Sequence, residues 1–346
     1  MQRGRKLAKL RAVVLLLLLS FPVWGEGFSL IELAEELQLD LKWEPYRKIG
    51  TLARGTTKVT FMPAVDSLVV NRKEEVKSGK IELRDGTLLA SDSAAGFLRE
   101  LFAVTDTIDG PHVSWIVIDP GHGGKDPGTN HRHTINGKSV YLVEKDIVLF
   151  VSTELKRMLE NRYPGKGVVL TRSDDTYLKL EERVEIANTI ELEAADESIV
   201  FISVHANASL NSATYGYEVW YLPPEYGRGN LLSEDIVGAD TKDLRQILNT
   251  MKDEEFTIQS VLLAQDILNG LDMTIGETSK NLGLKEESWF VVRNAKMPSV
   301  LVELGFVTNV TEAGRMADST HLRKMAAGLY NGITAFIEDF ESNTGG

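Results

Sequence analysis

Two of the six histidines stand at the ends of apolar runs of the sequence. His122 stands in the turn Asp-Pro-Gly-His-Gly-Gly after residues 115–118, and His205 follows residues 199–204. Both runs are rich in β-branched residues, which predicts strands that are buried on both faces. Ligands in open α/β sheets gather at the carboxyl ends of the strands, so the two imidazoles are expected to converge there. Taken alone, the turn around His122 would be better interpreted as a helix cap with an incidental histidine.

A glutamate supplies a third ligand at the same edge. Glu144 opens an amphipathic helix that the apolar spacing predicts over residues 144–161. An acid in a first helical turn could instead serve only to stabilise the helix dipole. With His122 and His205 it makes three ligands, the number that catalytic zinc uses while a fourth position is left to water. The sequence therefore predicts a Zn²⁺ site at this edge.

A second glutamate supplies the base that such a site needs. Glu303 follows the apolar residues 300–302 at the end of a predicted strand. An unpaired buried charge is costly, so a carboxylate here has few structural explanations, of which a salt bridge to Arg293 is one. We predict that Glu303 is the proton acceptor. The other four histidines stand in polar segments and are expected at the surface: His112, His131, His133 and His321.

Strands and helices alternate after residue 112, which predicts an α/β domain over residues 113–342. Its fold is expected to be a mixed, mostly parallel sheet with helices on both faces. Strands are predicted at residues 116–118, 167–171, 199–204, 217–222 and 299–303, and helices at 144–161, 180–195, 256–271 and 320–340. A polar linker is predicted at residues 104–112.

A small α+β domain is predicted before the linker, over residues 27–103. A Ser29 cap with Glu32 three residues later predicts a short helix, and a second helix is expected at residues 93–102. Strand-like runs cover residues 50–52, 58–62, 67–71 and 80–83. The order of these elements resembles the stalk domains that are similar to the amino-terminal domain of copper amine oxidases. We assign this part no chemistry.

The first 25 residues predict a secretory signal peptide. Five Lys and Arg residues precede an apolar run of 13 residues, which is too short for an ordinary transmembrane helix. An uncleaved anchor is the alternative; after cleavage no stable membrane span is expected. Cleavage would change the formal charge from −12 to −17. Such an acidic chain argues against nucleic-acid partners, and the absence of cysteine excludes thiolate chemistry and disulfides.

Several motifs together resemble the zinc-dependent N-acetylmuramoyl-L-alanine amidases. They are IVIDPGHGGKDPG, EKDIVL, VVLTRSDDTYLKLEERVEIAN, FISVHANAS, GYEVWYL and FVVRNAKMPSVLVELGFVTN, followed by the last helix. The resemblance covers residues 115–340 and implies cleavage of peptidoglycan between N-acetylmuramic acid and L-alanine by zinc-activated water. It implies His122, Glu144 and His205 as zinc ligands and Glu303 as the catalytic glutamate. Arg293 and Asn207 are expected to steady the substrate or orient Glu303.

The segment at residues 221–255 departs from the shortest members of that family. Relatives that act in cell separation carry a helix here that covers the zinc until an activator protein moves it, and we expect an inhibitory lid by analogy. Export to the periplasm or the cell exterior is expected from the signal peptide.

Two other hypotheses about the function stay open. One is another zinc-dependent cell-wall peptidase or deacetylase, and the other is a non-catalytic wall-binding protein on the same fold.

Overall fold

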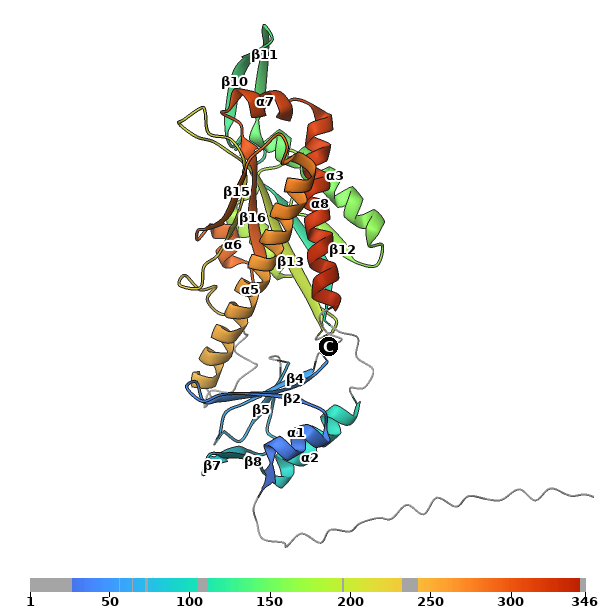
Figure 1. Ribbon diagram of the computed structural model, residues 1–346, viewed down its shortest axis with the longest axis vertical. Coiled ribbons are helices and arrows are strands. Elements are labelled where there is room, and N and C mark those ends of the chain that lie inside the picture. Colours follow the sequence, from blue (N-terminus) through green and yellow to red (C-terminus); the bar gives the residue numbers. More distant parts are fainter. Residues whose placement is uncertain are drawn as a thin grey trace, which may run out of the picture.

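The computed structural model describes residues 27–55, 57–63, 65–71, 74–104, 111–194, 196–231 and 242–342. A small module (residues 27–104) and a large domain (residues 111–342) follow one another along the long axis of the molecule (Figure 1). Residues 1–26 and 105–110 carry the predicted signal peptide and most of the predicted linker, and they lie outside the described residues. None of the described helices is long and apolar enough to cross a bilayer.

The large domain is built on one six-stranded sheet. Its strands are β9 (His112–Pro120), β12 (Gly167–Leu170), β13 (Glu197–Asn207), β14 (Tyr217–Tyr221), β15 (Asn281–Glu286) and β16 (Ser299–Phe306), in the order β12-β9-β13-β16-β14-β15. The first four strands in this order are parallel, and β14 runs antiparallel to β16 while β15 is parallel to β14. The predicted mixed, mostly parallel sheet is confirmed.

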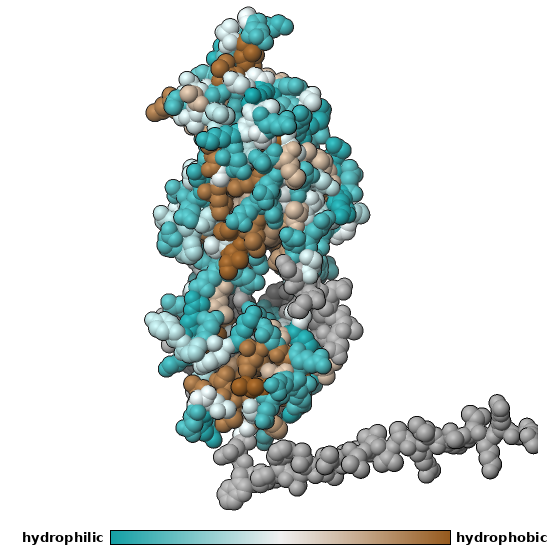
Figure 2. Space-filling model, viewed as in Figure 1, coloured by the Kyte–Doolittle hydropathy of each residue, from teal (hydrophilic) through white to brown (hydrophobic). Residues whose placement is uncertain are grey.

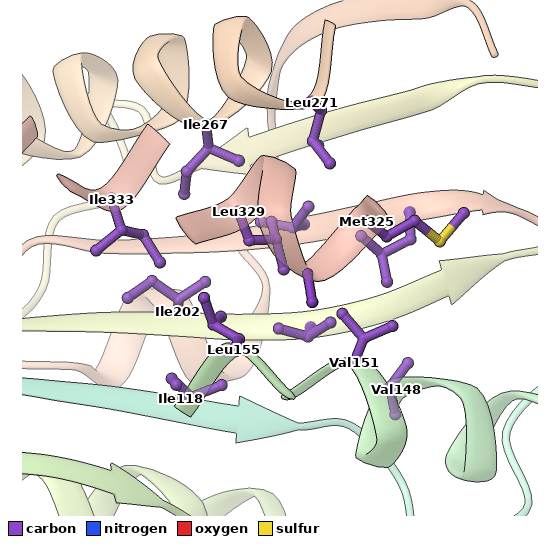
Figure 3. Close-up of a cluster of buried hydrophobic side chains, with 14 of the residues drawn as sticks. Ile118, Val148, Val151, Leu155, Ile202, Ile267, Leu271, Met325, Leu329 and Ile333 are labelled. Atoms are coloured by element: carbon purple, nitrogen blue, oxygen red, sulfur yellow. The ribbon is translucent and has the colours of Figure 1, made fainter. Parts of the chain in front are cut away.

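Helices cover both faces of this sheet, as predicted. Their bounds are α3 (Glu144–Arg162), α4 (Leu180–Asn188), α5 (Lys242–Ile275), α6 (Phe290–Asn294), α7 (Val310–Met316) and α8 (Ser319–Ser342). On one face, α3, α5 and α8 pack against alternate residues of the central strands, such as Ile118 and Ile202 (Figure 3). On the other face α4 and α6 contribute Val184 and Val292 to a smaller core. Because side chains alternate along a strand, each central strand contributes residues to both cores.

Two helices differ in length from their predictions. Helix α5 was predicted over residues 256–271, but it begins at Lys242 and has 34 residues. No glycine or proline interrupts residues 242–269, so the helix can start earlier. Helix α4 ends at Asn188 rather than at residue 195. After it, Ile190 and Leu192 pack against the smaller core from an irregular segment, so burial and not helical periodicity places them. Strand β16 also continues three residues past Glu303.

A polar hairpin was not predicted. Strands β10 (Asn130–Ile135) and β11 (Lys138–Val143) pair antiparallel and project from the end of the large domain (Figure 1). Asn136 and Gly137 form the turn with φ values of 54° and 75°, the left-handed geometry of a two-residue hairpin loop. The strands lack an apolar alternation because most of their residues are exposed. Strand β15 and helices α6 and α7 were also missed.

The module has two antiparallel sheets and two helices. The larger sheet contains β2 (Asp40–Glu44), β3 (Ile49–Arg54), β4 (Thr57–Phe61), β5 (Leu68–Val70) and β6 (Glu74–Val76), in sequence order. The smaller sheet pairs β1 (Phe28–Ser29), β8 (Thr87–Ala90) and β7 (Ile81–Arg84), and the helices are α1 (Leu30–Glu36) and α2 (Asp92–Val104). The Ser29 hydroxyl accepts a hydrogen bond from the Glu32 amide, as the cap prediction required.

The module packs against the first turns of α5. Arg47 donates two hydrogen bonds to the Glu254 carboxylate at 3.1 and 2.6 Å, and Leu248 is fully buried against Val69. The surface narrows between the two parts in Figure 2. A cleft of about 680 Å³ lies between them, with Ser198 and Pro298 among its lining residues. The module therefore faces the edge of the sheet at which β13 and β16 begin.

Candidate metal centre

The alternation of side chains gathers polar residues on one face of the central strands. In β13, Val204 and Ala206 point into the larger core, so Ser203 and His205 point to the opposite face, and the same rule places Glu303 of β16 there. His205 is the register partner of Glu303, and Glu303 is the partner of Glu218 in β14. An imidazole and a row of carboxylates thus meet at the end of the sheet that points away from the module.

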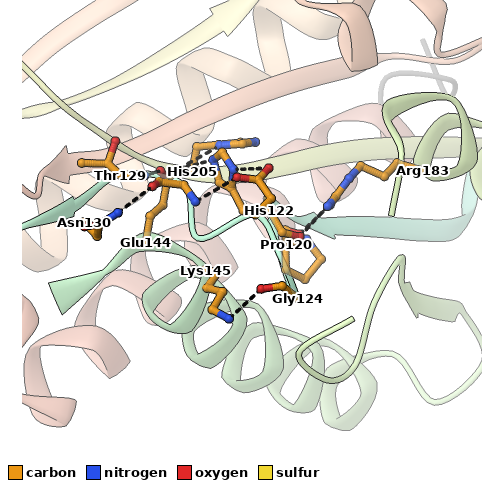
Figure 4. A network of polar contacts seen from close by, with 12 residues as sticks. Pro120, His122, Gly124, Thr129, Asn130, Glu144, Lys145, Arg183 and His205 are labelled. Carbon is orange, nitrogen blue, oxygen red and sulfur yellow. Dashed lines mark hydrogen bonds and ion pairs between the residues drawn. The ribbon is translucent and has the colours of Figure 1, made fainter. Parts of the chain in front are cut away.

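The three predicted ligands lie close enough to share one ion. One potential ligand atom from each of His122, Glu144 and His205 lies within 4.8 Å of the others. The Glu144 Oε1 is 3.1 Å from His122 Nε2 and 3.0 Å from His205 Nδ1 (Figure 4). The two imidazole rings lie 4.9 Å apart at an angle of 80°. This cluster of nitrogen, oxygen and nitrogen donors can bind a metal ion.

Backbone donors hold Glu144 in place. The Thr129 amide donates to Oε2 at 2.7 Å and the Ala206 amide donates to Oε1 at 3.0 Å. The side chain is buried at the first turn of α3. Burial alone would raise the pKa of Glu144, but the hydrogen bonds and charges of His122 and His205 outweigh it and hold the pKa well below its ordinary value. Glu144 is therefore a carboxylate that is ready to act as a ligand.

His122 is held by a strained turn and a second carboxylate. Its backbone has a φ of 59°, an unusual value for a residue with a Cβ atom. Its Nδ1 lies 2.9 Å from Asp126 Oδ2, so a carboxylate orients the ring from the side opposite Glu144. Burial opposes protonation of His122, but Glu144 and then Asp126 raise its pKa above the ordinary value. Asp126 was not predicted from the sequence, although it stands four residues after His122.

Two glycines of the loop make room for the cluster. A Cβ atom on Gly121 would lie 2.3 Å from His205 Cε1, and one on Gly128 would lie 2.5 Å from Glu144 Oε2. Both distances are shorter than real Cβ contacts, so no other residue fits without displacing a ligand. The glycine pattern around His122 therefore follows from the packing of the ligand side chains.

Glu303 lies beside the cluster without a hydrogen-bonding partner for its Oε2 atom among the described residues. Burial, followed by the charges of Glu144 and Glu218, raises its pKa well above the ordinary value. The alternative of a salt bridge is not seen: Arg293 is exposed on α6. A buried carboxyl group with a raised pKa beside the cluster is suited to accepting and releasing a proton.

The two predicted orienting residues lie in different surroundings. The Asn207 amide donates to Glu218 Oε1 at 2.8 Å, so it contacts a neighbour of Glu303. Arg293 is exposed, and its backbone amide donates to the Trp289 carbonyl. Glu218 was missed by the sequence analysis, although a glutamate between the buried residues Tyr217 and Val219 is the same signal that identified Glu303.

One surface histidine was wrongly predicted. His133 is buried, and its Nε2 lies 2.8 Å from the Val307 carbonyl oxygen, which ties the β10–β11 hairpin to the large domain. His131 is exposed, and its ring lies 4.5 Å from that of His133. His112 and His321 are partly exposed. None of these four belongs to the metal-binding cluster found among the described residues.

The described parts of the predicted lid lie away from the cluster. Strand β14 runs antiparallel to β16, so residues after Tyr221 leave the sheet at the edge where β16 begins. There Arg228 donates to Asp253 at 2.7 Å, and Ser260 accepts from the Ser299 amide at 2.9 Å. Residues 242–255 belong to α5. Residues 232–241 lie outside the described part of the chain.

Comparison with known proteins bears on this cluster. The family model of N-acetylmuramoyl-L-alanine amidases matches residues 116–335. The chain is 31% identical to the protein YqiI of Bacillus subtilis over 223 residues, which cover 64% of this chain and 84% of that protein. It is 29% identical to the amidase AmiA of Escherichia coli over 240 residues, or 66% of this chain and 77% of AmiA.

A solved amidase structure also aligns with this chain. The amidase AmiC2 of Nostoc punctiforme aligns with 67% of this chain and 99% of its own, with 29% identity and a TM-score of 0.46. The matched residues include the three predicted ligands, His122, Glu144 and His205, and the predicted base Glu303. The chain belongs to the N-acetylmuramoyl-L-alanine amidase family and is an amidase that degrades peptidoglycan.

Proposed function

We propose that this amidase is a Zn²⁺ enzyme that hydrolyses the amide bond between the lactyl group of N-acetylmuramic acid and L-alanine. The observation that carries the proposal is the convergence of His122, Glu144 and His205 beside Glu303, a carboxyl group with a raised pKa. Neutral imidazole nitrogens and one carboxylate are ligands that suit zinc.

The cluster fits such an ion by its own chemistry. Glu144 Oε1 lies between the two imidazoles at 3.1 and 3.0 Å, and the hydrogen bonds and charges of these imidazoles lower the pKa of Glu144 and keep it ionised. When bound, Zn²⁺ supplies a Lewis acid that polarises a carbonyl group and lowers the pKa of water toward about 7. Asp126 and the Thr129 amide keep the ligand side chains in register, as outer partners of metal ligands commonly do.

Glu303 moves the proton in this proposal. It accepts a proton from the attacking water and delivers it to the nitrogen that leaves when the carbon–nitrogen bond breaks. The products are a lactyl carboxylate and a peptide with a free L-alanine amino group. Asn207 and Glu218 orient Glu303 from the neighbouring strands. Arg293 is proposed to steady the substrate from the exposed face of α6.

Product analysis tests the bond that is cut. Purified peptidoglycan is digested, and we expect new L-alanine amino termini together with muramic acid that carries no peptide. Released D-alanine would instead indicate a peptidase, and released acetate a deacetylase.

Glu303→Gln should abolish turnover while zinc stays bound, whereas the exposed control Glu338→Gln on α8 should retain it. Undiminished turnover of Glu303→Gln would remove Glu303 from the mechanism.

Metal removal tests the cofactor. Dialysis against a chelator should abolish turnover, and one equivalent of Zn²⁺ should restore it, because the cluster supplies no nucleophile of its own. Magnesium should not restore turnover, since it prefers six oxygen ligands. A chelated, metal-free protein that keeps full turnover would contradict the proposal.

Export and regulation complete the proposal. We propose that residues 1–25 direct export to the periplasm or the cell exterior, and that the module is a stalk of the copper amine oxidase type. Residues 221–255 are proposed to respond to an activator protein, although the parts of this segment that the structure describes lie away from the metal cluster. Replacing residues 232–241 with a short Gly-Ser linker leaves α5 intact and tests the inhibitory role. Faster turnover would support it, and unchanged turnover would contradict it.

A further inference from the structure

Two arginines that the proposed reaction does not use lie buried behind the loop that carries His122. Arg172 follows β12 and Arg183 belongs to α4, and each side chain is buried. Neither element supplies a metal ligand. Most of the hydrogen bonds of the two side chains nevertheless go to the segments that carry His122 and Glu144.

Arg172 joins the two segments that carry the first two ligands. Its Nη2 donates to the Gly121 carbonyl at 2.7 Å and to the Lys145 carbonyl at 2.9 Å. Gly121 directly precedes His122, and Lys145 directly follows Glu144. Its Nε donates to the Pro120 carbonyl at 2.9 Å. One guanidinium group thus spans the loop and the start of α3.

Arg183 holds the same loop from α4. Its Nη1 donates to the Pro120 carbonyl at 2.7 Å (Figure 4). The same Nη1 donates to the Asp119 carboxylate at 2.8 Å, and Nη2 donates to the His122 carbonyl. The three consecutive carbonyl groups of residues 120–122 therefore all accept hydrogen bonds from Arg172 or Arg183.

The positive charge of Arg172 does not explain why an arginine stands at this position. Burial and the neighbouring Arg183 lower its pKa, and a fixed cation behind the cluster repels a metal ion. Arg183 is ion-paired with Asp119, whereas the hydrogen bonds of Arg172 go to carbonyl oxygens. What arginine offers here is a planar fork whose donors reach several acceptors at once, which a lysine cannot reproduce.

We propose that Arg172, assisted by Arg183, is a positioning residue that fixes the separation of His122 and Glu144 before the metal binds. The proposal rests on the metal centre of the proposed function. The two buried arginines would thus preorganise the metal site by binding backbone carbonyl groups next to its ligands.

Metal affinity of the full chain tests the proposal. Zn²⁺ binding to metal-free protein is measured by competition with a chromophoric chelator. Arg172→Lys keeps the charge and loses the fork, so its affinity should fall about 10- to 100-fold, the usual effect of losing an outer partner. The control Arg162→Lys, at an exposed pair with Glu338, should bind like the wild type. Wild-type affinity in Arg172→Lys would overturn the proposal, whereas a wild type that binds no zinc would overturn the proposed function instead.

Hydrogen exchange of the unmodified protein gives a second test, which does not depend on a variant folding. The Gly121 amide donates to the Val204 carbonyl at 3.0 Å and the Gly123 amide to the Asp126 carbonyl at 2.9 Å. Both amides should exchange slowly in metal-free protein, because the arginines already hold the loop. Fast exchange that slows only after zinc is added would contradict the proposal.

Discussion

Glu303 shares its face of the sheet with the carboxylate of Glu218 and lies near that of Glu144. Burial and the two neighbouring charges raise its pKa, so the folded chain keeps this proton over a pH range in which the unfolded chain has lost it. The folded state then binds more protons than the unfolded state, and its stability falls as the pH rises through that range. The group that suits proton transfer therefore destabilises the fold at neutral pH.

Replacing Glu303 with glutamine removes this cost. We expect metal-free Glu303→Gln to melt at a higher temperature than the wild type near about pH 8, with little difference near about pH 4, where Glu303 is largely protonated in both states. Differential scanning calorimetry at both pH values measures the two gains. An equal gain at both would show that the effect is packing and not charge.

Asp126 is expected to tune the first ligand. Asp126→Asn keeps the shape of the side chain but removes the charge that faces His122 Nδ1 at 2.9 Å. Zinc affinity should fall about 10- to 100-fold, as is usual for the loss of a carboxylate partner of a ligating histidine. The matched control is Asp40→Asn, at an exposed pair in the module. Equal affinity of the two variants would remove Asp126 from the centre.

The sequence alone locates the residues that end apolar strands and misses those that act through the backbone. His122, His205 and Glu303 interrupt or follow buried runs, so their burial can be read locally. Arg172 and Arg183 stand in polar segments that look solvated. Most of their partners are backbone carbonyl groups of distant segments, which no side-chain pattern encodes.

At the scale of elements, helices α5 and α8 cross where both backbones carry glycine. A Cβ atom on Gly332 would lie 2.4 Å from Ile267 Cα, and one on Gly270 would lie 2.2 Å from the Gly328 carbonyl oxygen. The helices therefore pack in backbone contact over the larger core. Apolar spacing predicted that these helices exist, but the closeness of their crossing is a property of the pair.

A methyl group at this crossing should force the helices apart. Gly332→Ala is expected to destabilise the protein by about 1–3 kcal/mol, the usual cost of overpacking a core. Gly314→Ala in α7 is the matched control, because its Cβ atom would meet the nearest Ile135 atom at 3.5 Å, an ordinary contact. Urea denaturation measures both. A neutral Gly332→Ala would show that the crossing can relax.

At the scale of the whole molecule, the module and the metal centre lie at opposite ends of the central strands of one sheet. The contacts between the two parts that the structure describes include one exposed ion pair, worth about 0–1 kcal/mol, and the buried Leu248. The hydrophobic contact should therefore dominate the attachment. No pattern in either part reveals this pairing, since it joins residues that are about 180 positions apart.

Leu248→Asp places a charge in that contact and should release the module while the chemistry continues. We expect a larger radius of gyration in small-angle scattering and unchanged turnover on soluble muropeptides, because the metal cluster is remote from Leu248. Ile258→Asp is the matched control: it puts the same charge on the same helix at an exposed apolar residue, so the radius should stay unchanged. An unchanged radius in Leu248→Asp would show that other contacts hold the module.

Helix α5 starts on the module and ends within the large domain, and its 34 residues span about 50 Å. A continuous helix of this kind resists bending, so it acts as a spacer between the two parts. If the module is anchored in the wall, the enzyme has a defined reach. It would cut bonds at a set radius from its anchor and leave those beside the anchor intact.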